Sequence, residues 1–474
     1  MGRIFSGATA ALALVALAGG AGAQVLGTPV DEGLDGVFEE FGSGTPGCGV
    51  ALLDAAGTLH FRGYGEAVLE HGVPITPTTV FHAASIAKPM TAMAVAQLVG
   101  GGRLSLDDEV RKHIPELPPY GHPLTVRHLL THTSGVRDQW VLTRLAGWRD
   151  GDPISQGDIL ALLFAQRELG FEPGSAWVYS NSNYTLLAEI VERVSGRPFP
   201  EYTRERIFEP LGMDRTRFQA DHRDLIEGRA SAYEPEGDGW KVSEPVFDNY
   251  GATNLLTTPM DLARWARNLW TREVSPEAVD LLVSERARLS DGTLMADIGL
   301  GLFLGRPGGL LAAGHNGSDA GFTGDLLAFL DERLAVATLC NVATAYAYDL
   351  NPAAARVALS DRWAPPAPRE PRAPREEEPA PAPLTAPDRR RLAGAYRSAE
   401  LDVTWLLVVD GDALVLHRRR FAPVTLRTSS SGALTWASGS YEIGLVPEGD
   451  RIIALRVTHE RARNIRFDRV EERP

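Results

Sequence analysis

A proline-rich segment late in the chain limits the fold more than any other feature, because no core can extend through it. The segment "APPAPREPRAPREEEPAPAPLTAP" extends from Ala364 to Pro387 and mixes proline with charged residues. This composition predicts a semi-rigid, extended linker, which we place at residues 363–388. A chain of 474 residues is also too long for one ordinary core. We therefore expect a large domain at residues 24–362 and a small one at residues 389–474.

The larger part has strand-like sequence at both ends and helical patterns between them. "VALLDAAGTLHFRGYGEA" predicts two short strands around a turn at Gly57, and "GDLLAFLDERLAVATLC" predicts two buried strands joined at Asp331 and Glu332. "TLLAEIVERVSG" is an amphipathic helix that ends at Gly196. This order predicts the α+β class, with one antiparallel or mixed sheet closed by the two ends of the domain.

The smaller part consists of short strand-like segments. "VTWLLVVDGDALVLH" is a hairpin signal with Asp410 and Gly411 at the turn. "GALTWA", "YEIGLV", "RIIALRVT" and "NIRFDRV" continue the pattern. We expect a small all-β domain, either a barrel or a sandwich.

The first residues, "MGRIFSGATAALALVALAGGAGAQ", are typical of a bacterial secretory signal. A short basic start with Arg3 precedes an apolar run that is too short to span a bilayer, and "AGA" before Gln24 fits cleavage after Ala23. We expect residues 1–23 to be removed and the mature protein to be periplasmic or secreted, without a membrane span. An uncleaved membrane anchor is the alternative.

Two features of the composition bear on partners and cross-links. The net charge of -14 argues against a nucleic-acid partner, which would need a basic surface. The two cysteines, Cys48 and Cys340, each border an apolar, strand-like run. In an oxidising compartment they could form a disulfide, and two separate buried thiols are the alternative.

A serine and a lysine three residues apart begin an apolar helical pattern in "FHAASIAKPMTAMAVAQLVGGGRL". Ser85 and Lys88 share one face of that helix, and Lys88 is one of only three lysines in the chain. A serine hydroxyl needs a neighbouring base to act as a nucleophile. A buried lysine has a lowered pKa and can accept that proton. The alternative is a serine that only caps the helix beside a solvated lysine.

Two further motifs follow along the chain. "WVYSNSNYTLL" places Tyr179 and Asn181 two residues apart before a helix, and "AAGHNGSDAGF" places His315 and Gly317 at the start of a strand. The order Ser-x-x-Lys, Tyr-x-Asn, His-x-Gly resembles the serine β-lactamase and penicillin-binding-protein superfamily, in its class C and D-alanyl-D-alanine carboxypeptidase branch. "TVRHLLTHTSG" and "TNLLTTPMDLARW" also resemble segments of that family, and the similarity covers about residues 30 to 350.

This resemblance implies a fold and a set of roles. The fold would be a β-lactamase-like antiparallel sheet flanked by helices, with a helical subdomain, followed by a lipocalin-like β-domain. Ser85 would form an acyl-enzyme, and Lys88 would share proton transfer with Tyr179. Asn181 would bind the amide side of the substrate, and the backbone N–H groups of Ser85 and Ser318 would form the oxyanion hole. Cys48 and Cys340 would lie on neighbouring strands and pair.

The third motif departs from class C β-lactamases, which have Lys-Thr-Gly where this chain has His315, Asn316 and Gly317. A histidine with a pKa of about 6.5 is mostly neutral at pH 7 and cannot supply a permanent charge for a β-lactam carboxylate. Gly317 keeps side-chain bulk away where the strand approaches the substrate. Relatives with histidine here include D-alanyl peptidases, D-aminopeptidases and esterases. We therefore expect a secreted hydrolase of D-aminoacyl peptides or small esters, including peptidoglycan-derived peptides, and rank β-lactamase activity second.

Two other functions compete with this expectation. His128 and His132 in "RHLLTH" have a spacing that zinc sites use, but Leu129 stands where a metallohydrolase has glutamate, and we expect no metal and no cofactor. An inactive cell-wall or β-lactam-binding protein is the alternative of another class. Acylation followed by turnover would separate an enzyme from such a binding protein.

Overall fold

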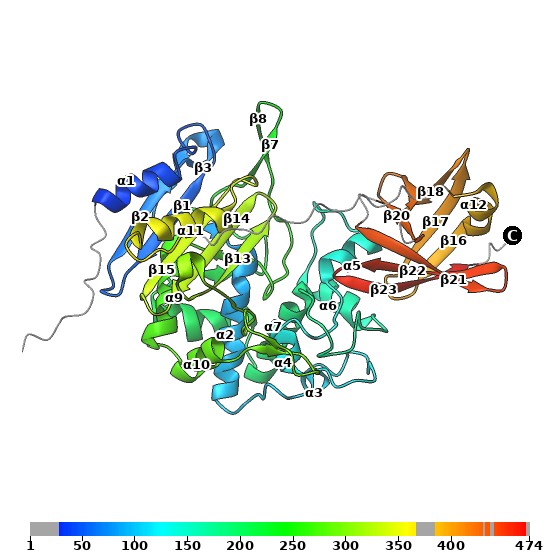
Figure 1. Ribbon diagram of the computed structural model, residues 1–474, viewed down its shortest axis with the longest axis horizontal. Coiled ribbons are helices and arrows are strands. Elements are labelled where there is room, and N and C mark those ends of the chain that lie inside the picture. The colour runs from blue at the N-terminus through cyan, green and yellow to red at the C-terminus, as the bar shows by residue number, and fades with distance from the viewer. Residues whose placement is uncertain (1–27, 366–383, 430–431, 437–439, 471–474) are drawn as a thin grey trace, which may run out of the picture.

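The computed structural model describes residues 28–365, 384–429, 432–436 and 440–470, which form a large mixed body and a separate barrel (Figure 1). The predicted signal sequence lies outside the described residues, as does most of the predicted linker. Among the described residues, none of the helices has the length and apolar character that a membrane crossing needs.

A six-stranded antiparallel sheet forms the centre of the large body. Its strand order is β12-β13-β14-β15-β1-β2, so the first strand of the domain pairs with its last strand. The strands are β1 (Cys48–Leu53), β2 (Leu59–Tyr64), β12 (Phe303–Gly305), β13 (Ala312–Asp319), β14 (Phe322–Phe329) and β15 (Leu334–Cys340). The predicted α+β class, with a sheet closed by the two ends of the domain, is confirmed.

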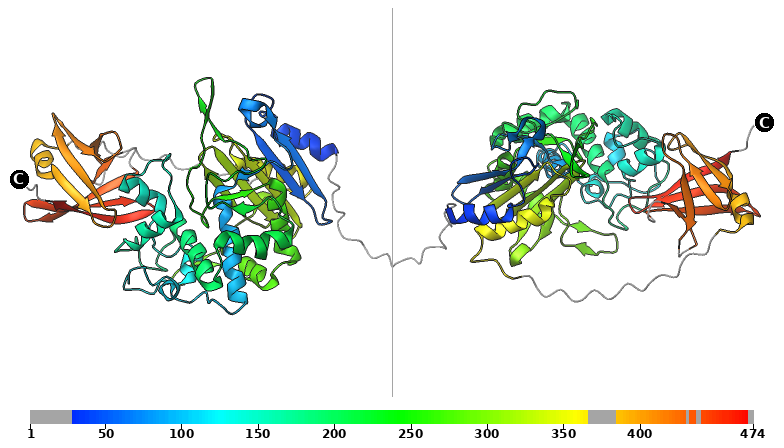
Figure 2. Two further views of the ribbon diagram at one scale, coloured as in Figure 1. Left: turned by 180° about the vertical axis from the view of Figure 1, so that it is seen from behind. Right: turned by 90° about the horizontal axis from the view of Figure 1, so that it is seen from above.

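Both faces of β1 are buried. Along β1, Val50 and Leu52 pack with α1 (Thr28–Val37) and α11 (Ala347–Ala358), which Figure 2 shows side by side. The residue between them, Ala51, belongs to the core on the opposite face. Successive side chains of a strand point to opposite faces, so two helical layers bury this strand completely.

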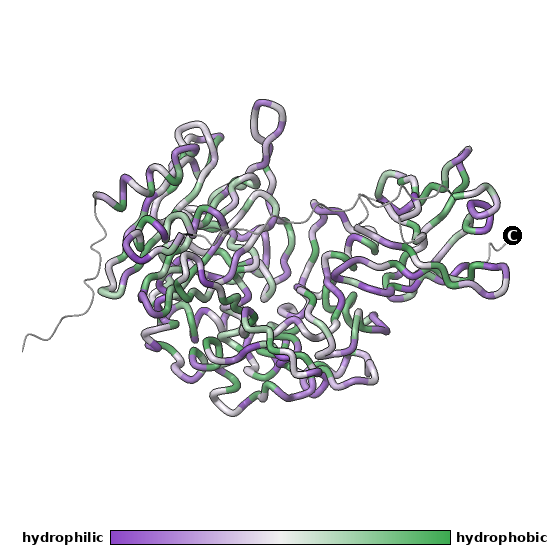
Figure 3. Tube along the Cα trace, viewed as in Figure 1, coloured by the Kyte–Doolittle hydropathy of each residue, from purple (hydrophilic) through white to green (hydrophobic). Residues whose placement is uncertain are grey.

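The helices of the opposite face surround α2, which is buried along most of its length. Figure 3 shows apolar segments concentrated where α2 and the sheet pack. The α-helices of this region are α2 (Ala87–Gly100), α3 (Val110–His113), α4 (Val126–Leu130), α5 (Gln139–Ala146), α6 (Gln156–Phe164), α7 (Asn181–Ser195), α8 (Phe199–Thr203), α9 (Pro259–Thr271) and α10 (Pro276–Ser284). The predicted amphipathic helix is α7, and Gly196 ends it in the left-handed conformation.

Short strands complete the large body. They are β3 (Glu66–Val68), β4 (Val73–Pro74), β5 (Phe81–His82), β6 (Arg217–Phe218), β7 (Tyr233–Glu236), β8 (Gly239–Val242), β9 (Leu255–Thr257), β10 (Ala287–Arg288) and β11 (Leu294–Met295). The pairing of β5 with β9 matters for function, because β5 leads directly into Ser85.

A disulfide joins Cys48 to Cys340, as the resemblance implied. The two residues are opposite each other in the pairing of β1 with β15, and both are fully buried. The bond closes a loop with a sequence separation of 292 residues. Such a loop is worth on the order of 5 kcal/mol in the chain-entropy model of disulfide stabilisation.

The C-terminal part is a closed eight-stranded antiparallel barrel, in which β16 pairs with β23. Its elements are α12 (Ala386–Leu392), β16 (Gly394–Ser398), β17 (Val403–Asp410), β18 (Ala413–His417), β19 (Val424–Thr428), β20 (Leu434–Trp436), β21 (Tyr441–Glu448), β22 (Arg451–His459) and β23 (Ala462–Val470). Trp405 packs against Phe467 and Trp436 in the interior. Aromatic side chains thus occupy the barrel core.

The predicted hairpin of β17 and β18 is confirmed, but its turn lies one residue later than predicted. Asp410 is still paired, with Ala413, and the turn consists of Gly411 and Asp412. Gly411 has a φ of 56°, which glycine adopts readily at the first position of a two-residue hairpin turn. The positive φ of Gly411 therefore fits the two-residue turn that this register requires.

Candidate active site

Ser85 lies in a short, tightly wound turn between β5 and α2. The 3-10 turn Ala84–Ile86 precedes the helix, and the N–H of Ala83 donates to the carbonyl of Leu255 in β9. Ala84 has a φ of 48°, a left-handed conformation that costs a residue with a side chain about 1–2 kcal/mol. Such conformations persist where the surroundings hold them, often at functional sites.

Lys88 lies one helical turn beyond Ser85 and is completely buried. Its Nζ donates to Ser85 Oγ at 3.0 Å, to Asn181 Oδ1 at 2.9 Å and to the carbonyl of Ala252 at 2.7 Å. Burial lowers the pKa of Lys88 to about 7, although the negative charges of Asp138 and Asp319 act in the opposite direction. A substantial share of this amine is therefore neutral near pH 7 and can accept a proton from the serine.

Asn181 begins α7 and is held on both sides. Its backbone N–H and its Nδ2 donate to Asp138 Oδ2 at 2.7 and 2.8 Å, while its Oδ1 accepts from Lys88. Because both ends of the amide have partners, its orientation is set. The side chain of Asn181 thus connects Asp138 to Lys88 by hydrogen bonds.

Tyr179 lies over the same lysine, with its ring centroid 4.9 Å from Lys88 Nζ. Burial raises the pKa of the Tyr179 phenol, and the neighbouring Ser85 acts in the opposite direction. The phenol is therefore protonated near neutral pH and suited to donate or relay a proton. Of the two groups beside Ser85, Lys88 is the better resting-state base.

Strand β13 closes the other side of the serine. A Cβ atom added at Gly317 would lie 2.5 Å from the carbonyl oxygen of Ala83 and 2.9 Å from the nitrogen of Ser85. The backbones therefore approach each other as only glycine allows. Only residues 312–314 of this strand pair with β12, so the edge beyond them is free to face the serine, and Ser318 lies on it.

His315 is buried beneath this edge. Burial lowers the pKa of its imidazole to about 3, with a further contribution from the positive charge of Lys88. Its ring lies 4.7 Å from that of Phe303 and 6.3 Å from that of Tyr179. The imidazole is therefore neutral throughout the physiological range and supplies no positive charge to the site.

A cleft of about 640 Å³ opens over Ser85. Its lining comes from the segment before α7, from β12 and β13, and from the C-terminal barrel. The residues are Trp177, Val178, Tyr179, Phe303, Asn316, Gly317, Ser318, Glu460, Arg461 and Arg463. The structure thus brings the predicted residues Ser85, Lys88, Tyr179, Asn181, His315, Gly317 and Ser318 to one place.

The sequence model of the beta-lactamase family matches residues 34–359. The chain belongs to this family. Penicillin-binding protein 4* of Bacillus subtilis (strain 168) is 29% identical over 330 residues, which cover 65% of this chain and 71% of that protein. A D-aminopeptidase of Gluconobacter oxydans (strain 621H) is 29% identical over 301 residues, which cover 62% of this chain and 56% of that protein.

Solved structures have a similar fold. The octameric penicillin-binding protein homologue from Pyrococcus abyssi has a TM-score of 0.59 and 24% identity, with 92% of this chain and 98% of that one covered. This coverage includes most of the barrel as well as the large domain. As a member of the beta-lactamase family, the protein is a serine hydrolase.

The histidines considered for zinc have other partners. His132 Nδ1 accepts from the N–H of Ser180 at 3.2 Å, and burial lowers the pKa of His132 well below its usual value. His128 Nδ1 accepts from the N–H of Thr125. Among the described residues, the group whose donor atoms lie close enough together for a metal is Asp221, His222 and Asp248, and it includes neither histidine.

Sequence reasoning missed two residues of the site. Asp138 follows the family-like segment "LLTHTSG", but nothing in its spacing indicates that it binds Asn181. Arg461 lies in the barrel, between the strand-like runs "RIIALRVT" and "NIRFDRV". The hairpin itself could be predicted, but not its position at the cleft.

Proposed function

We propose that the protein is a D-specific serine hydrolase that acts through an acyl-Ser85 intermediate on D-aminoacyl peptides, D-aminoacyl amides or small esters. Its family membership and the similarity to a penicillin-binding protein and a D-aminopeptidase support the D-specific part of this proposal. The contact between Lys88 and Ser85 carries the mechanistic part.

In the first step, neutral Lys88 takes the proton of Ser85 as Oγ attacks the substrate carbonyl. The 3.0 Å distance from Nζ to Oγ and the pKa of about 7 for Lys88 support this role. Asn181 and the carbonyl of Ala252 then accept hydrogen bonds from the protonated amine. The serine is activated without histidine.

The developing oxyanion would accept from the N–H groups of Ser85 and Ser318, which the close approach at Gly317 supports. Tyr179 would relay the proton to the leaving group, because its phenol is protonated and lies beside Lys88. Water would then hydrolyse the acyl-enzyme by the reverse proton path. Each step uses a group that lines the cleft or lies directly below it.

Efficient β-lactam hydrolysis is the second candidate. The neutral, buried His315 offers no charge for a β-lactam carboxylate at the position where class C enzymes have lysine. We therefore place peptides, amides and esters first.

We further propose that the protein is exported. The signal-like sequence over residues 1–23 supports this, and so does the disulfide between Cys48 and Cys340, since structural disulfides are rare in reducing compartments. An N-terminus at Gln24 in protein recovered from the periplasm or medium would agree with it. Retention of the intact N-terminus in the cytoplasm would contradict it.

The test of the catalytic proposal is intact mass and turnover with Ser85→Ala as the matched variant. The protein is mixed with a penicillin, a D-alanyl amide, its L-alanyl counterpart and a short ester. We expect D-selective turnover that disappears in Ser85→Ala. We also expect a penicillin adduct on the enzyme with Ser85 intact and none on Ser85→Ala. Rapid consumption of penicillin would favour the β-lactamase alternative, and a stable adduct without any turnover would favour a binding protein.

A further inference from the structure

The C-terminal barrel reaches the active-site cleft through one hairpin. The two residues that connect β22 to β23, Glu460 and Arg461, line the cleft that opens over Ser85, and Arg463 lines it as well. Figure 1 shows β22 and β23 extending from the barrel toward α5 and α6 of the large domain. The barrel is therefore part of the cleft wall.

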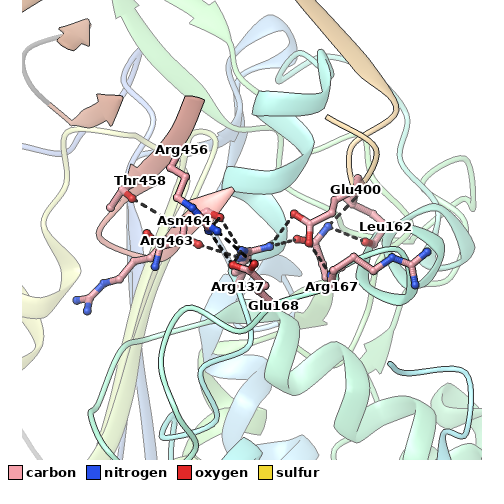
Figure 4. A network of polar contacts seen from close by, with 10 residues as sticks. Arg137, Leu162, Arg167, Glu168, Glu400, Arg456, Thr458, Arg463 and Asn464 are labelled. Carbon is pink, nitrogen blue, oxygen red and sulfur yellow. Dashed lines mark hydrogen bonds and ion pairs between the residues drawn. The ribbon is translucent and has the colours of Figure 1, made fainter. Parts of the chain in front are cut away.

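Polar contacts of buried groups hold this hairpin in place. The side chain of Arg137 is 1% exposed and donates to Glu400 Oε2 at 3.0 Å, to the carbonyl of Arg463 at 2.8 Å and to the carbonyl of Asn464 at 3.0 Å (Figure 4). The next residue, Asp138, donates its N–H to the carbonyl of Arg461 at 2.9 Å. The backbone on which Arg461 stands is thus preorganised relative to the catalytic residues.

The guanidinium of Arg461 lies over the catalytic residues. Its Cζ is 5.3 Å from the ring centroid of Tyr179, and its side chain is 43% exposed. Within the described part of the chain, its ion pair is with Glu460 of the same turn, at 3.5 Å through Nε. An exposed pair of this kind is weak. The outer nitrogens of the fork therefore remain suited to a bound ligand.

The other basic side chains near Ser85 are poorly suited to bind an anion in the cleft. His315 is neutral, and Lys88 is buried below the cleft with all three donors engaged. Arg461 and Arg463 are the remaining cations among the cleft residues, and Arg461 is the one that contacts a catalytic side chain. Arginine matches a carboxylate with two parallel hydrogen bonds.

We propose that Arg461, presented by the C-terminal barrel, binds a free carboxylate of the substrate and so makes the enzyme selective for acyl donors that carry one. This rests on the proposed acyl-serine function. The barrel thereby supplies the charge that the third motif lacks. Among the substrates of the proposed function, peptides and esters with a free carboxylate on the leaving-group side are then preferred over amides and esters that lack one.

A binding experiment tests this without turnover. In the full-length Ser85→Ala variant, affinities for N-acetyl-D-alanyl-D-alanine and for its C-terminal amide are measured by calorimetry or by tryptophan fluorescence, since Trp177 lines the cleft. We expect the free acid to bind about 10- to 100-fold more tightly, which is the usual value of a charge-assisted pair. Adding Arg461→Ala should bring the ratio close to one, and Arg461→Lys should restore part of it.

Two matched variants locate the effect. Arg463→Ala removes a second cleft cation, and Arg427→Ala removes an exposed arginine of β19 that does not line the cleft. Both should keep the preference for the acid. Equal affinities for acid and amide, tighter binding of the amide, no binding of either, or loss of the preference in Arg463→Ala instead would each overturn the proposal.

A kinetic pair separates this proposal from the catalytic one. Enzyme with Ser85 intact is given an N-acyl-D-alanyl thioester of thioglycolate and the matching thioester of its methyl ester, and thiol release is followed. Arg461→Ala should lower kcat/KM for the carboxylate substrate about 10- to 100-fold more than for the neutral one. An equal loss on both would overturn the Arg461 proposal, whereas turnover that survives Ser85→Ala would overturn the proposed function and leave the binding result to decide on Arg461.

Discussion

The two walls of the cleft are built in opposite ways. On the α2 side, Ser85 and Lys88 lie within one helical turn, and the lysine is completely buried with three hydrogen-bond acceptors. On the barrel side, Arg461 and Glu460 come from the far end of the chain, and their side chains are 43% and 75% exposed. The first wall is suited to chemistry, because burial lowers the pKa of an amine. The second wall is suited to recognition, because a guanidinium that is partly exposed to water stays charged and can be reached by a ligand.

The largest effects should come from the buried wall. Ser85→Ala and Lys88→Met should each lower kcat/KM about 10³-fold or more, because they remove the nucleophile and its base. Lys112→Ala is the matched control, since Lys112 is an exposed lysine paired with Asp108. Steady-state kinetics checks this, and near-normal activity in Lys88→Met would contradict the assignment of the base.

The contact between β13 and the serine turn should be nearly as sensitive. In Gly317→Ala the new methyl would meet the carbonyl of Ala83 at 2.5 Å, so the strand has to move away from Ser85. We expect a loss of about 10²-fold in kcat, since small displacements at reacting groups have effects of this size. Gly305→Ala on β12, whose nearest contact would be 3.9 Å, should be close to neutral. Comparable activities of the two variants would show that the approach is not tight.

Removing Arg137 should loosen the barrel wall and leave the other intact. Arg137→Ala removes the ion-pair partner of the buried Glu400, which keeps the hydrogen bond from the N–H of Arg167, and it releases the hairpin. We expect a cost of about 3 kcal/mol. Arg456→Ala removes a partly exposed ion pair with Glu168 and a hydrogen bond to the carbonyl of Asn464, and it should cost less, about 1–2 kcal/mol. Chemical denaturation checks both values. In Arg137→Ala, the reaction of Ser85 with a small neutral ester should decrease less than the binding of a carboxylate substrate. The reverse order would contradict the assignment of chemistry to one wall and recognition to the other.

The smallest expected effect is a shift in the pH dependence of kcat/KM, caused by the charge of Arg461 on one wall acting on Lys88 of the other. The acid limb of kcat/KM should lie near pH 7, because activity rises as Lys88 loses its proton. The positive charge of Arg461 lowers the pKa of Lys88, so Arg461→Ala should raise that pKa and move the limb to higher pH. A pH–rate profile with the neutral substrate measures this. A limb that moves to lower pH would mean that the two groups do not interact in this way.

Much of the buried wall could be predicted from the sequence, because its signals are local. The spacing of Ser85 and Lys88 places both on one helix face, and Tyr179 and Asn181 stand directly before α7. The alternating strands at the start and end of the large domain likewise indicated a sheet closed by its two ends. Even so, the left-handed conformation of Ala84, directly before the serine, has no signature in residue type.

The amino-acid sequence by itself indicated the strands at both ends of the large domain, helix α7, the three motifs and an all-β C-terminal part, because periodicity, turn residues and short spacings act between near neighbours. Only the tertiary structure decided how strongly burial would shift Lys88 and His315, and that a hairpin of the barrel would stand over Tyr179. Those properties depend on which surfaces meet and exclude water. Contacts such as that of Arg137 with Glu400 join residues far apart in the chain, and no local pattern encodes them.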